Sequence, residues 1–415
     1  MHSRRKTGGL EKKRRDVLLA MSPTVPDRDV GVRRFAREAG WNLMPVSRLV
    51  GGAGGLGGWR GDGALVTLRE DPAVVAFAAA LRRRRIPVVD LTEERPDIRV
   101  PRVCLDNHAV GHIAAEHFAE RNYRHAAWFS THWMNVQAKR YAGFSEAWTE
   151  RRGRTVGASL PGAGNGASAM PRWVLCEGVQ AARRNDSRAV ARWFAGLLRA
   201  APKPLALLCH CGEDAARVLA ECRALGIAVP DEVAILSAGD YFHICEMQSV
   251  PISSVEINGE RHGYEAAALL NRLMNGEAPP RKPPLVPPGS LTVRASTDHT
   301  AAADPLVERA LSFIAENFGR AWGPAQLCRT LGVSQLKLER HFKAELGRTP
   351  GEEILRQRLS EARTLLRDTD LPLARIAELC GFCHASYLSN VFRRETGLSP
   401  REYRRNPSSP SALGV

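Results

Sequence analysis

Residues 325–396 contain the same short pattern twice, and this repeat constrains the fold more than any other feature of the chain. Each copy is a short amphipathic helix, a turn at Gly332 or Gly381, and a second helix. A small turn residue lets the second helix project while its apolar positions pack on the first. A long amphipathic helix over residues 351–367 joins the copies, so the sequence predicts a compact all-helical domain with two helix-turn-helix units. Their four helices are expected over 325–331, 334–346, 373–380 and 385–396.

The second helix of each unit has an apolar face and a polar face. Arg and Asn can bond guanine and adenine edges in two places, whereas Lys and Ser mostly hold phosphates. A solvated surface helix can show the same polar face, but recurrence of the whole unit favours DNA contact. The inward residues are Leu338, Phe342, Leu388, Val391 and Phe392. The outward residues are Gln335, Lys337, Arg340, Lys343, Ser386, Ser389, Asn390, Arg393 and Arg394.

The region before the repeat alternates short apolar runs with amphipathic segments. Such alternation predicts parallel sheets with helices on both faces, and these sheets bind ligands at the carboxyl ends of their strands. A glycine-rich break over residues 153–166 favours a division into two lobes. The expected strands are 17–21, 64–68, 86–91, 126–130, 205–209 and 233–236. The expected helices are 30–39, 108–120, 139–151, 186–200, 214–225 and 260–275.

A proline-rich stretch marks the boundary between these regions. Six prolines fall between Pro279 and Pro288, and a polar run follows at 296–300. This composition is typical of a connector. We therefore expect a sensory domain over residues 14–298 and a DNA-binding domain over residues 299–407.

Charge and targeting signals agree with a polyanionic partner inside the cell. The chain has a formal charge of +15, and Lys and Arg that meet phosphates gain affinity by releasing counterions. The basic start is followed by only five apolar residues, 17–21, and the longest apolar stretch, 73–81, is about half of a spanning helix. We expect a cytoplasmic protein with no membrane partner. Its nine scattered cysteines are expected to be reduced thiols.

Two motifs are better explained by their context than by catalysis. Cys380-Gly-Phe-Cys-His384 fits the pattern of haem attachment or of a redox pair, but it occupies the turn of the second helix-turn-helix. Gly52-x-Gly54-x-x-Gly57 precedes a strand and opens no helix, so it is expected to be a loop and not a dinucleotide site. No enzyme activity, cofactor or metal site is expected.

The helical region resembles the DNA-binding domain of the AraC/XylS family. The resemblance lies in 331–347 (LGVSQLKLERHFKAELG), 376–382 (IAELCGF) and 397–404 (GLSPREYR). It implies that the two second helices enter successive major grooves and that Leu336, Glu339, Arg340, Ala385, Ser386, Ser389 and Asn390 approach the bases. Ser334 is the expected N-cap of its helix, and His384 precedes the other. The expected DNA-binding set is Ser334, Gln335, Leu336, Lys337, Glu339, Arg340, Lys343, His384, Ala385, Ser386, Ser389, Asn390 and Arg393.

The region before it resembles the sugar-binding core of the LacI/GalR repressors and the periplasmic binding proteins. The residues that carry this resemblance are 105–111 (LDNHAVG), 140–144 (RYAGF) and 229–235 (VPDEVAI). In this order the two parts resemble bacterial xylose-operon regulators, which implies an α/β two-lobed domain, a small effector such as a sugar in its cleft, and a homodimer on double-stranded DNA. RNA polymerase is a further expected partner. Asp106, Asn107, Arg140 and Asp240 are the expected ligand-binding residues, with Arg140 as a fork donor to hydroxyls.

The resemblance also implies an acidic residue after each of two strands, 205–209 and 233–236. Our alignment places Gly212 and Gly239 there, so weak binding of D-xylose is expected unless Asp214 and Asp240 replace the missing acids. Two hypotheses stay open: a ligand-responsive regulator, or a regulator whose sensory domain no longer binds sugar and serves as a dimerisation or docking scaffold.

Overall fold

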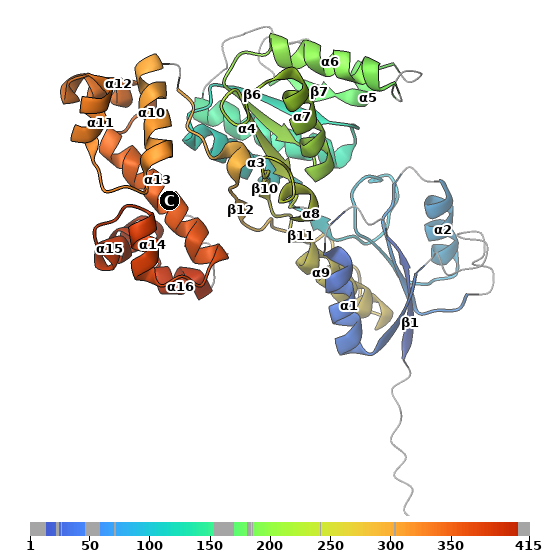
Figure 1. Cartoon of the computed structure of the whole chain (residues 1–415). Helices are drawn as coiled ribbons and strands as arrows, with labels where there is room; N and C mark the ends of the chain where they lie inside the picture. The colour runs from blue at the N-terminus through green and yellow to red at the C-terminus, as the bar shows by residue number, and fades with distance from the viewer. Residues whose placement is uncertain are drawn as a thin grey trace, which may run out of the picture.

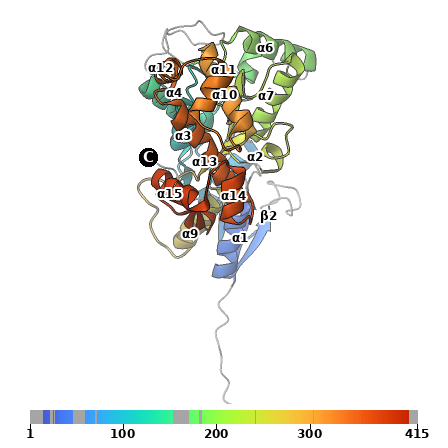
Figure 2. The ribbon, with the colours of Figure 1, turned by 60° about the vertical axis from the view of Figure 1, so that its left-hand side comes forward.

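The computed structural model describes residues 14–21, 25, 27–45, 59–69, 72–152, 170–180, 184, 186–240, 242–302 and 304–405. Figure 1 shows two α/β lobes and a helical domain that lies beside the second of them. Figure 2 shows the long helix α13 in the middle of that helical domain. The predicted fold class is confirmed: an α/β two-lobed region is followed by an all-α region.

The first lobe is built on a parallel sheet in the order β2-β1-β3-β4. Apolar side chains alternate between its faces, since Val17 packs with α1 and α9 whereas its neighbour Leu18 packs with α2. The strands are β1 (Arg15–Ala20), β2 (Trp41–Pro45), β3 (Gly63–Val66) and β4 (Val88–Asp90). The helices are α1 (Arg28–Ala39), α2 (Pro72–Arg83) and α9 (Gly259–Met274).

The second lobe has a six-stranded sheet in the order β12-β10-β9-β8-β6-β7, antiparallel only between β10 and β12. Helices α3 and α4 cover one face, and α6 and α7 cover the other. The strands are β6 (His125–Ser130), β7 (Arg172–Val174), β8 (Leu205–Cys209), β9 (Val233–Ala238), β10 (Ser253–Val255) and β12 (Leu291–Thr292). The helices are α3 (Asn107–Glu120), α4 (Asn135–Arg152), α5 (Leu175–Gly178), α6 (Ser187–Ala200), α7 (Gly212–Leu225) and α8 (Phe242–Cys245).

One helix pair in each lobe packs backbone against backbone through glycines. A Cβ on Gly31 of α1 would lie 1.8 Å from the carbonyl oxygen of Glu260 in α9. A Cβ on Gly111 of α3 would lie 2.0 Å from the carbonyl oxygen of Arg140 in α4. Neither position can hold a larger residue without separating its two helices, so each pair is a closely packed unit.

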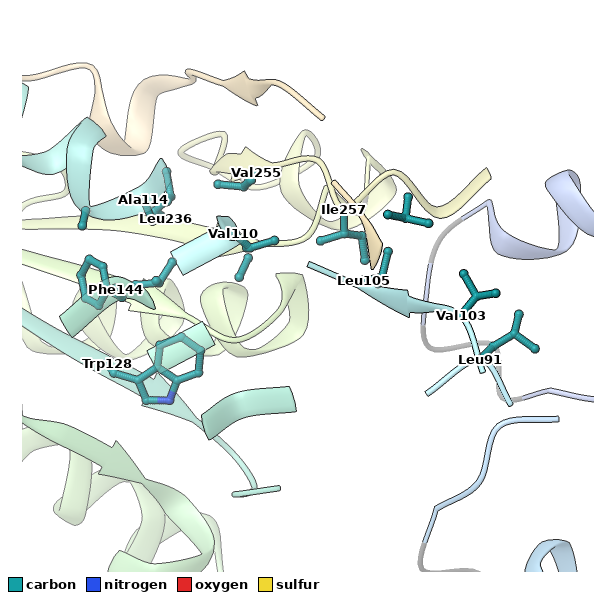
Figure 3. Close-up of a cluster of buried hydrophobic side chains, with 14 of the residues drawn as sticks. Leu91, Val103, Leu105, Val110, Ala114, Trp128, Phe144, Leu236, Val255 and Ile257 are labelled. Atoms are coloured by element: carbon teal, nitrogen blue, oxygen red, sulfur yellow. The ribbon is translucent and has the colours of Figure 1, made fainter. Parts of the chain in front are cut away.

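The chain crosses between the lobes three times, and the crossings lie side by side. Strand β5 (Cys104–Leu105) leads into α3, and β11 (Leu285–Val286), which pairs with it in parallel, returns from α9. Between them, Glu256 exchanges backbone hydrogen bonds with Gly289 and Ser290 at 2.8 and 3.0 Å. Figure 3 shows the apolar side chains of Leu91, Val103, Leu105 and Ile257 at these crossings.

These crossings correct two expectations. The proline-rich stretch before residue 288 is not a free connector, because it contains β11 and leads directly into β12, and both strands pair with earlier parts of the α/β region. The lobes are also not separated at one point in the chain, because α9 belongs to the first lobe although it follows most of the second. The glycine-rich stretch 153–166 and the motif 52–57 lie outside the described residues.

The helical domain begins at α10 and has two cores joined by α13. Ile354 of α13 packs in the first core, whereas Leu359, Ala362 and Leu366 pack in the second. The helices are α10 (Pro305–Asn317), α11 (Pro324–Leu331), α12 (Gln335–Leu346), α13 (Pro350–Asp368), α14 (Leu373–Leu379), α15 (Ala385–Thr396) and α16 (Pro400–Arg405). Within the described ranges, no helix is long and apolar enough to cross a membrane.

Candidate nucleic-acid interface and ligand cleft

Both helix-turn-helix units form, and two equivalent positions hold the second helix of each. Leu338 and Phe342 of α12 are fully buried and pack with Leu327 of α11. Fifty residues later, Leu388 and Phe392 of α15 are fully buried in the second core. The predicted inward face is confirmed, and the common spacing means that matching positions of α12 and α15 point outward.

The starts of the helices follow their local chemistry. Ser334 is the N-cap of α12, and its Oγ accepts a hydrogen bond from the Lys337 amide at 3.3 Å, as its residue type predicts. His384, in extended conformation, is the N-cap of α15. The turn residue Gly332 has a φ of 68°, a left-handed conformation that glycine adopts without a steric cost.

Most of the predicted DNA-binding side chains are exposed on this outward face. Leu336 is 79% exposed, more than any other large apolar side chain in the described ranges. Glu339, Ala385 and Ser389 are half-buried, and Glu339 Oε1 accepts a hydrogen bond from Gln335 Nε2 at 2.8 Å. The exposed residues are Ser334, Gln335, Leu336, Lys337, Arg340, Lys343, His384, Ser386, Asn390 and Arg393.

The two outward faces differ in chemistry at matching positions. Arg340 of α12 corresponds to Asn390 of α15, and Leu336 corresponds to Ser386. Guanidinium and amide groups select different base edges in the major groove. The geometry therefore suits two adjacent half-sites of different sequence.

A cavity of about 270 Å³ lies between the two α/β lobes. Its walls come from the carboxyl ends of strands, the region where a parallel sheet binds ligands. From the first lobe it is lined by Arg28, Arg69, Thr92, Glu93 and Glu94, and from the second by Asn107, Thr131, Gln137, Arg140, His210 and Asp214. Cys104, Leu105 and Ile257 of the crossings close its apolar side.

Two of the predicted ligand-binding residues, Asn107 and Arg140, meet in this cavity. Both are buried, and Arg140 Nε donates to Asn107 Oδ1 at 2.9 Å. Arg140 Nη1 also donates to the carbonyl oxygens of His210 and Ala238, each at 2.8 Å. The guanidinium is therefore held firmly by three elements of the second lobe.

The other two, Asp106 and Asp240, do not line the cavity. Asp106 is the N-cap of α3, and its carboxylate accepts a hydrogen bond from the Ala109 amide at 3.0 Å. Asp240 forms an ion pair with Arg294, at 3.1 Å between Oδ2 and Nη2. The Asp106 carboxylate is therefore engaged by its own helix and the Asp240 carboxylate by a distant arginine, both outside the cavity.

Asp214 lies in the cavity wall, unlike Asp240. Its carboxylate accepts hydrogen bonds from the amide and hydroxyl of Thr131, the amide at 3.1 Å. Burial raises the pKa of Asp214, although these hydrogen bonds oppose the shift. Burial lowers the pKa of His210 well below its ordinary value, and the charge of Arg140 adds to the effect. The wall thus presents a neutral imidazole beside a fixed guanidinium.

Several residues that line the cleft were not predicted from the sequence, chief among them Glu93 and Glu94. The Glu94 carboxylate accepts a hydrogen bond from the Asn135 amide across the cleft at 2.9 Å. Glu93 forms an ion pair with Lys139, and its carbonyl oxygen accepts from Asn135 Nδ2 at 2.6 Å. A signal existed, because Glu93, Thr131 and His210 each follow shortly after the end of a strand.

Comparisons with known proteins match the two parts of the chain separately. Residues 115–297 match the family described as "Periplasmic binding protein-like domain", and residues 327–406 match "Helix-turn-helix domain". A "Xylose operon regulatory protein" of Haemophilus influenzae is 31% identical over 235 residues, which are 56% of this chain and 60% of that protein. The protein of the same description from Escherichia coli K12 is 27% identical over 403 residues, 95% of this chain and 97% of that one.

A "Putative AraC-like transcription regulator" of Streptomyces lividans is 38% identical over 108 residues, 26% of this chain and 36% of that one. Among solved structures, a "xylose-binding transcription activator xylR" has a TM-score of 0.59 at 22% identity and covers 96% of this chain and 100% of its own. A "transcriptional regulator CelR-cellobiose complex" has a TM-score of 0.51 at 23% identity and covers 68% and 85%. At these identities, the structures show the fold alone.

Proposed function

We propose that this chain is a DNA-binding transcriptional regulator and that an effector in the interlobe cleft controls its hold on DNA. The proposal is supported by the joining of a periplasmic-binding-protein-like domain to an AraC-type helix-turn-helix domain. In this proposal, residues 14–298 sense the effector and residues 299–407 bind an asymmetric double-stranded site. A homodimer and contact with RNA polymerase belong to the same proposal.

The observation that carries the DNA-binding role is the pair of exposed, equivalent faces on α12 and α15. Matching positions face outward on both helices, yet carry different side chains, as Arg340 and Asn390 do. Residues 304–405 hold 17 Lys and Arg against 13 Asp and Glu, a modest excess of cations. Specific base contacts must therefore contribute alongside general phosphate attraction.

Selection of random duplex DNA on the full chain tests this role. We expect a recovered site with two different blocks about one helical turn apart, because paired helices read successive major grooves. Recovery of sequences without a shared site would contradict specific recognition.

The effector role rests on the cavity between the lobes, which is of a size suited to a small polar molecule. Its polar walls and apolar crossings suit a sugar or a compound with similar hydroxyl groups. Thermal-shift measurements on the full chain with pentoses and hexoses test this, because a ligand that binds only the folded state raises the melting temperature.

A second candidate is a sensory domain that serves only as a dimerisation or docking scaffold. It is favoured by the internal bonding of the cavity, where Arg140 and Asp214 already bond to protein groups. The same screen separates the candidates, since a scaffold shows no shift with any sugar while selected DNA still binds.

A further inference from the structure

Helix α3 begins in the cleft, and its first residue contacts both lobes. Asn107 is 3% exposed, and its Oδ1 accepts a hydrogen bond from Arg140 Nε. Its Nδ2 donates to Glu93 Oε1 of the other lobe at 3.1 Å. A change in the gap between the lobes therefore alters a contact on the first residue of α3.

The body of α3 is suited to carry such a change without bending. Its 14 residues span about 20 Å, and Gly111 brings its backbone against α4. A Cβ on Gly143 of α4 would likewise lie 2.0 Å from the carbonyl oxygen of His108. Helices α3 and α4 consequently move as one unit.

The other end of α3 is tied to the segment that leads into the helical domain. Arg121, the C-cap of α3, donates from Nε to the Thr297 carbonyl oxygen at 2.9 Å and from Nη1 to His117 Nδ1 at 3.0 Å. Because Nδ1 accepts, His117 Nε2 carries the proton and donates to Thr297 Oγ1 at 2.7 Å. The Arg121 carbonyl oxygen accepts from the Ala301 amide at 2.8 Å.

One residue of that segment, Thr300, reaches into the helical domain. Its Oγ1 accepts a hydrogen bond from Arg356 Nη2 of α13 at 2.7 Å and donates to Glu353 Oε1 at 3.3 Å. Thr300 is 4% exposed and Glu353 is 1% exposed, so both are buried, whereas the side chain of Arg356 is 31% exposed. Helix α13 carries side chains of both helical cores, and its position sets the placement of α12 relative to α15.

We call His117, Arg121, Thr297, Thr300, Glu353 and Arg356 the polar junction. We propose that α3 and the polar junction couple closure of the cleft to the position of α13, and thereby to the placement of the two DNA-reading helices. A buried polar network tolerates partner exchange better than partial loss of hydrogen bonds, so a shift of α3 moves it between discrete arrangements. In Figure 1 the helical domain lies against the lobe that holds α3. The inference rests on the proposed function, because it needs DNA to bind this domain.

The test uses the reciprocity of coupled sites: if the cleft affects DNA binding, DNA binding must affect the cleft. The backbone amide of Asn135 reports cleft closure, because it donates a hydrogen bond to the Glu94 carboxylate of the opposite lobe. Hydrogen exchange of peptides covering residues 132–138 is measured on the full chain, with and without saturating DNA selected from a random pool. We expect saturating DNA to change exchange of the Asn135 amide at least about five-fold, the lower end of usual allosteric coupling.

The variant Thr300→Val keeps the shape of the side chain and removes the hydroxyl. In this variant, saturating DNA should change the hydrogen-exchange rate of the Asn135 backbone amide less than about two-fold, although DNA still binds to saturation. Thr364→Val is the matched control, because Thr364 lies on α13 and its hydroxyl donates to the Ser360 carbonyl oxygen of the same helix at 3.3 Å. Arg356→Lys keeps the charge but loses the planar guanidinium that donates to both Thr300 and Glu353. It should behave like Thr300→Val, and it provides the test if Thr300→Val folds poorly.

An unchanged exchange response in Thr300→Val and Arg356→Lys overturns the inference. The inference is also overturned if bound DNA leaves exchange of the Asn135 amide unchanged in the wild type. In the first case the proposed function stands in full. In the second case effector control fails together with the inference, and only the DNA-binding role remains, because DNA has bound. Failure to select any DNA is a different result, which removes the proposed function itself.

Discussion

Arg340 of α12 and Asn390 of α15 occupy the same position on their helices, each two residues after a fully buried leucine. Both side chains are exposed, and each belongs to a residue type that bonds one base by two contacts. The pair therefore gives a direct way to assign half-sites.

We expect Arg340→Ala to weaken binding to the selected DNA by about 1–3 kcal/mol and to relax discrimination at one base pair. Asn390→Ala should relax a different position in the other half-site. Fluorescence anisotropy on single-base variants of the site measures both. Arg309→Ala, which removes an exposed charge from α10, is the control and should weaken all sequences slightly and equally. Equal loss on random DNA in Arg340→Ala would count against base reading.

Buried histidines should make the protein less stable in mild acid. Burial, aided by the charge of Arg28, lowers the pKa of His262 to about 3, while its unfolded value is 6.5. The neutral side chain thus stabilises the fold above pH 6.5, and this contribution is lost as the pH falls towards about 3. At pH 5 the loss is roughly 2 kcal/mol. Urea unfolding of wild type and His262→Gln at pH 7.5 and 5 measures it.

Asp90 acts in the opposite direction over the same interval. Burial raises its pKa from 3.8 to about 6, so its contribution is present at low pH and is lost as the pH rises through that interval. Because Asp90 is common to wild type and His262→Gln, its effect cancels in their difference. An identical pH slope for the two proteins would show that His262 titrates normally.

The two cysteines of the second turn should differ sharply in reactivity. Burial raises the pKa of Cys380 to about 12, whereas Cys383 is exposed. A disulfide reagent at neutral pH should label Cys383 in the native protein and reach Cys380 only after unfolding. Mass spectrometry of labelled peptides checks this, with Cys383→Ser as the unlabelled control. Replacing both by alanine should leave any response to oxidants unchanged, and its loss would reveal a functional thiol pair.

D-xylose should bind weakly. Asp240 is engaged by Arg294 and Asp214 by Thr131, so two carboxylates expected to hold a sugar are committed to protein groups. Charged hydrogen bonds contribute about 1.5–3 kcal/mol each, and losing two costs roughly two to four powers of ten in affinity. Calorimetry should give a millimolar dissociation constant. A micromolar value would mean that one of these carboxylates changes partner on binding.

The long helices could be predicted because their signals are local. Helices α1, α3, α6, α7 and α9 begin within two residues of expectation, since their apolar spacing is a local signal, and Asp side chains cap the starts of α3 and α6. Strand β11 could not be predicted, because it lies in a proline-rich stretch and exists only through pairing with Cys104 and Leu105. Its register depends on contacts made more than a hundred residues away.

The cleft was predicted in part for a similar reason. Asn107 and Arg140 were identified, and both lie in the cavity. Asp106 and Asp240 were also expected there, but the first caps its own helix and the second pairs with Arg294. Only the fold shows which carboxylates are engaged elsewhere and which residues the opposite lobe contributes.

The triple crossing between the lobes has a consequence for synthesis on the ribosome. The sheet of the first lobe is complete by residue 90, but α9, which covers one of its faces, ends at residue 274. The nascent first lobe therefore has α1 but not α9 on that apolar face while the whole second lobe except β12 is made. A chain that stalls before α9 emerges exposes apolar surface to which chaperones bind. Expression yield should therefore depend on translation speed across residues 91–274 more than on the stability of the finished protein.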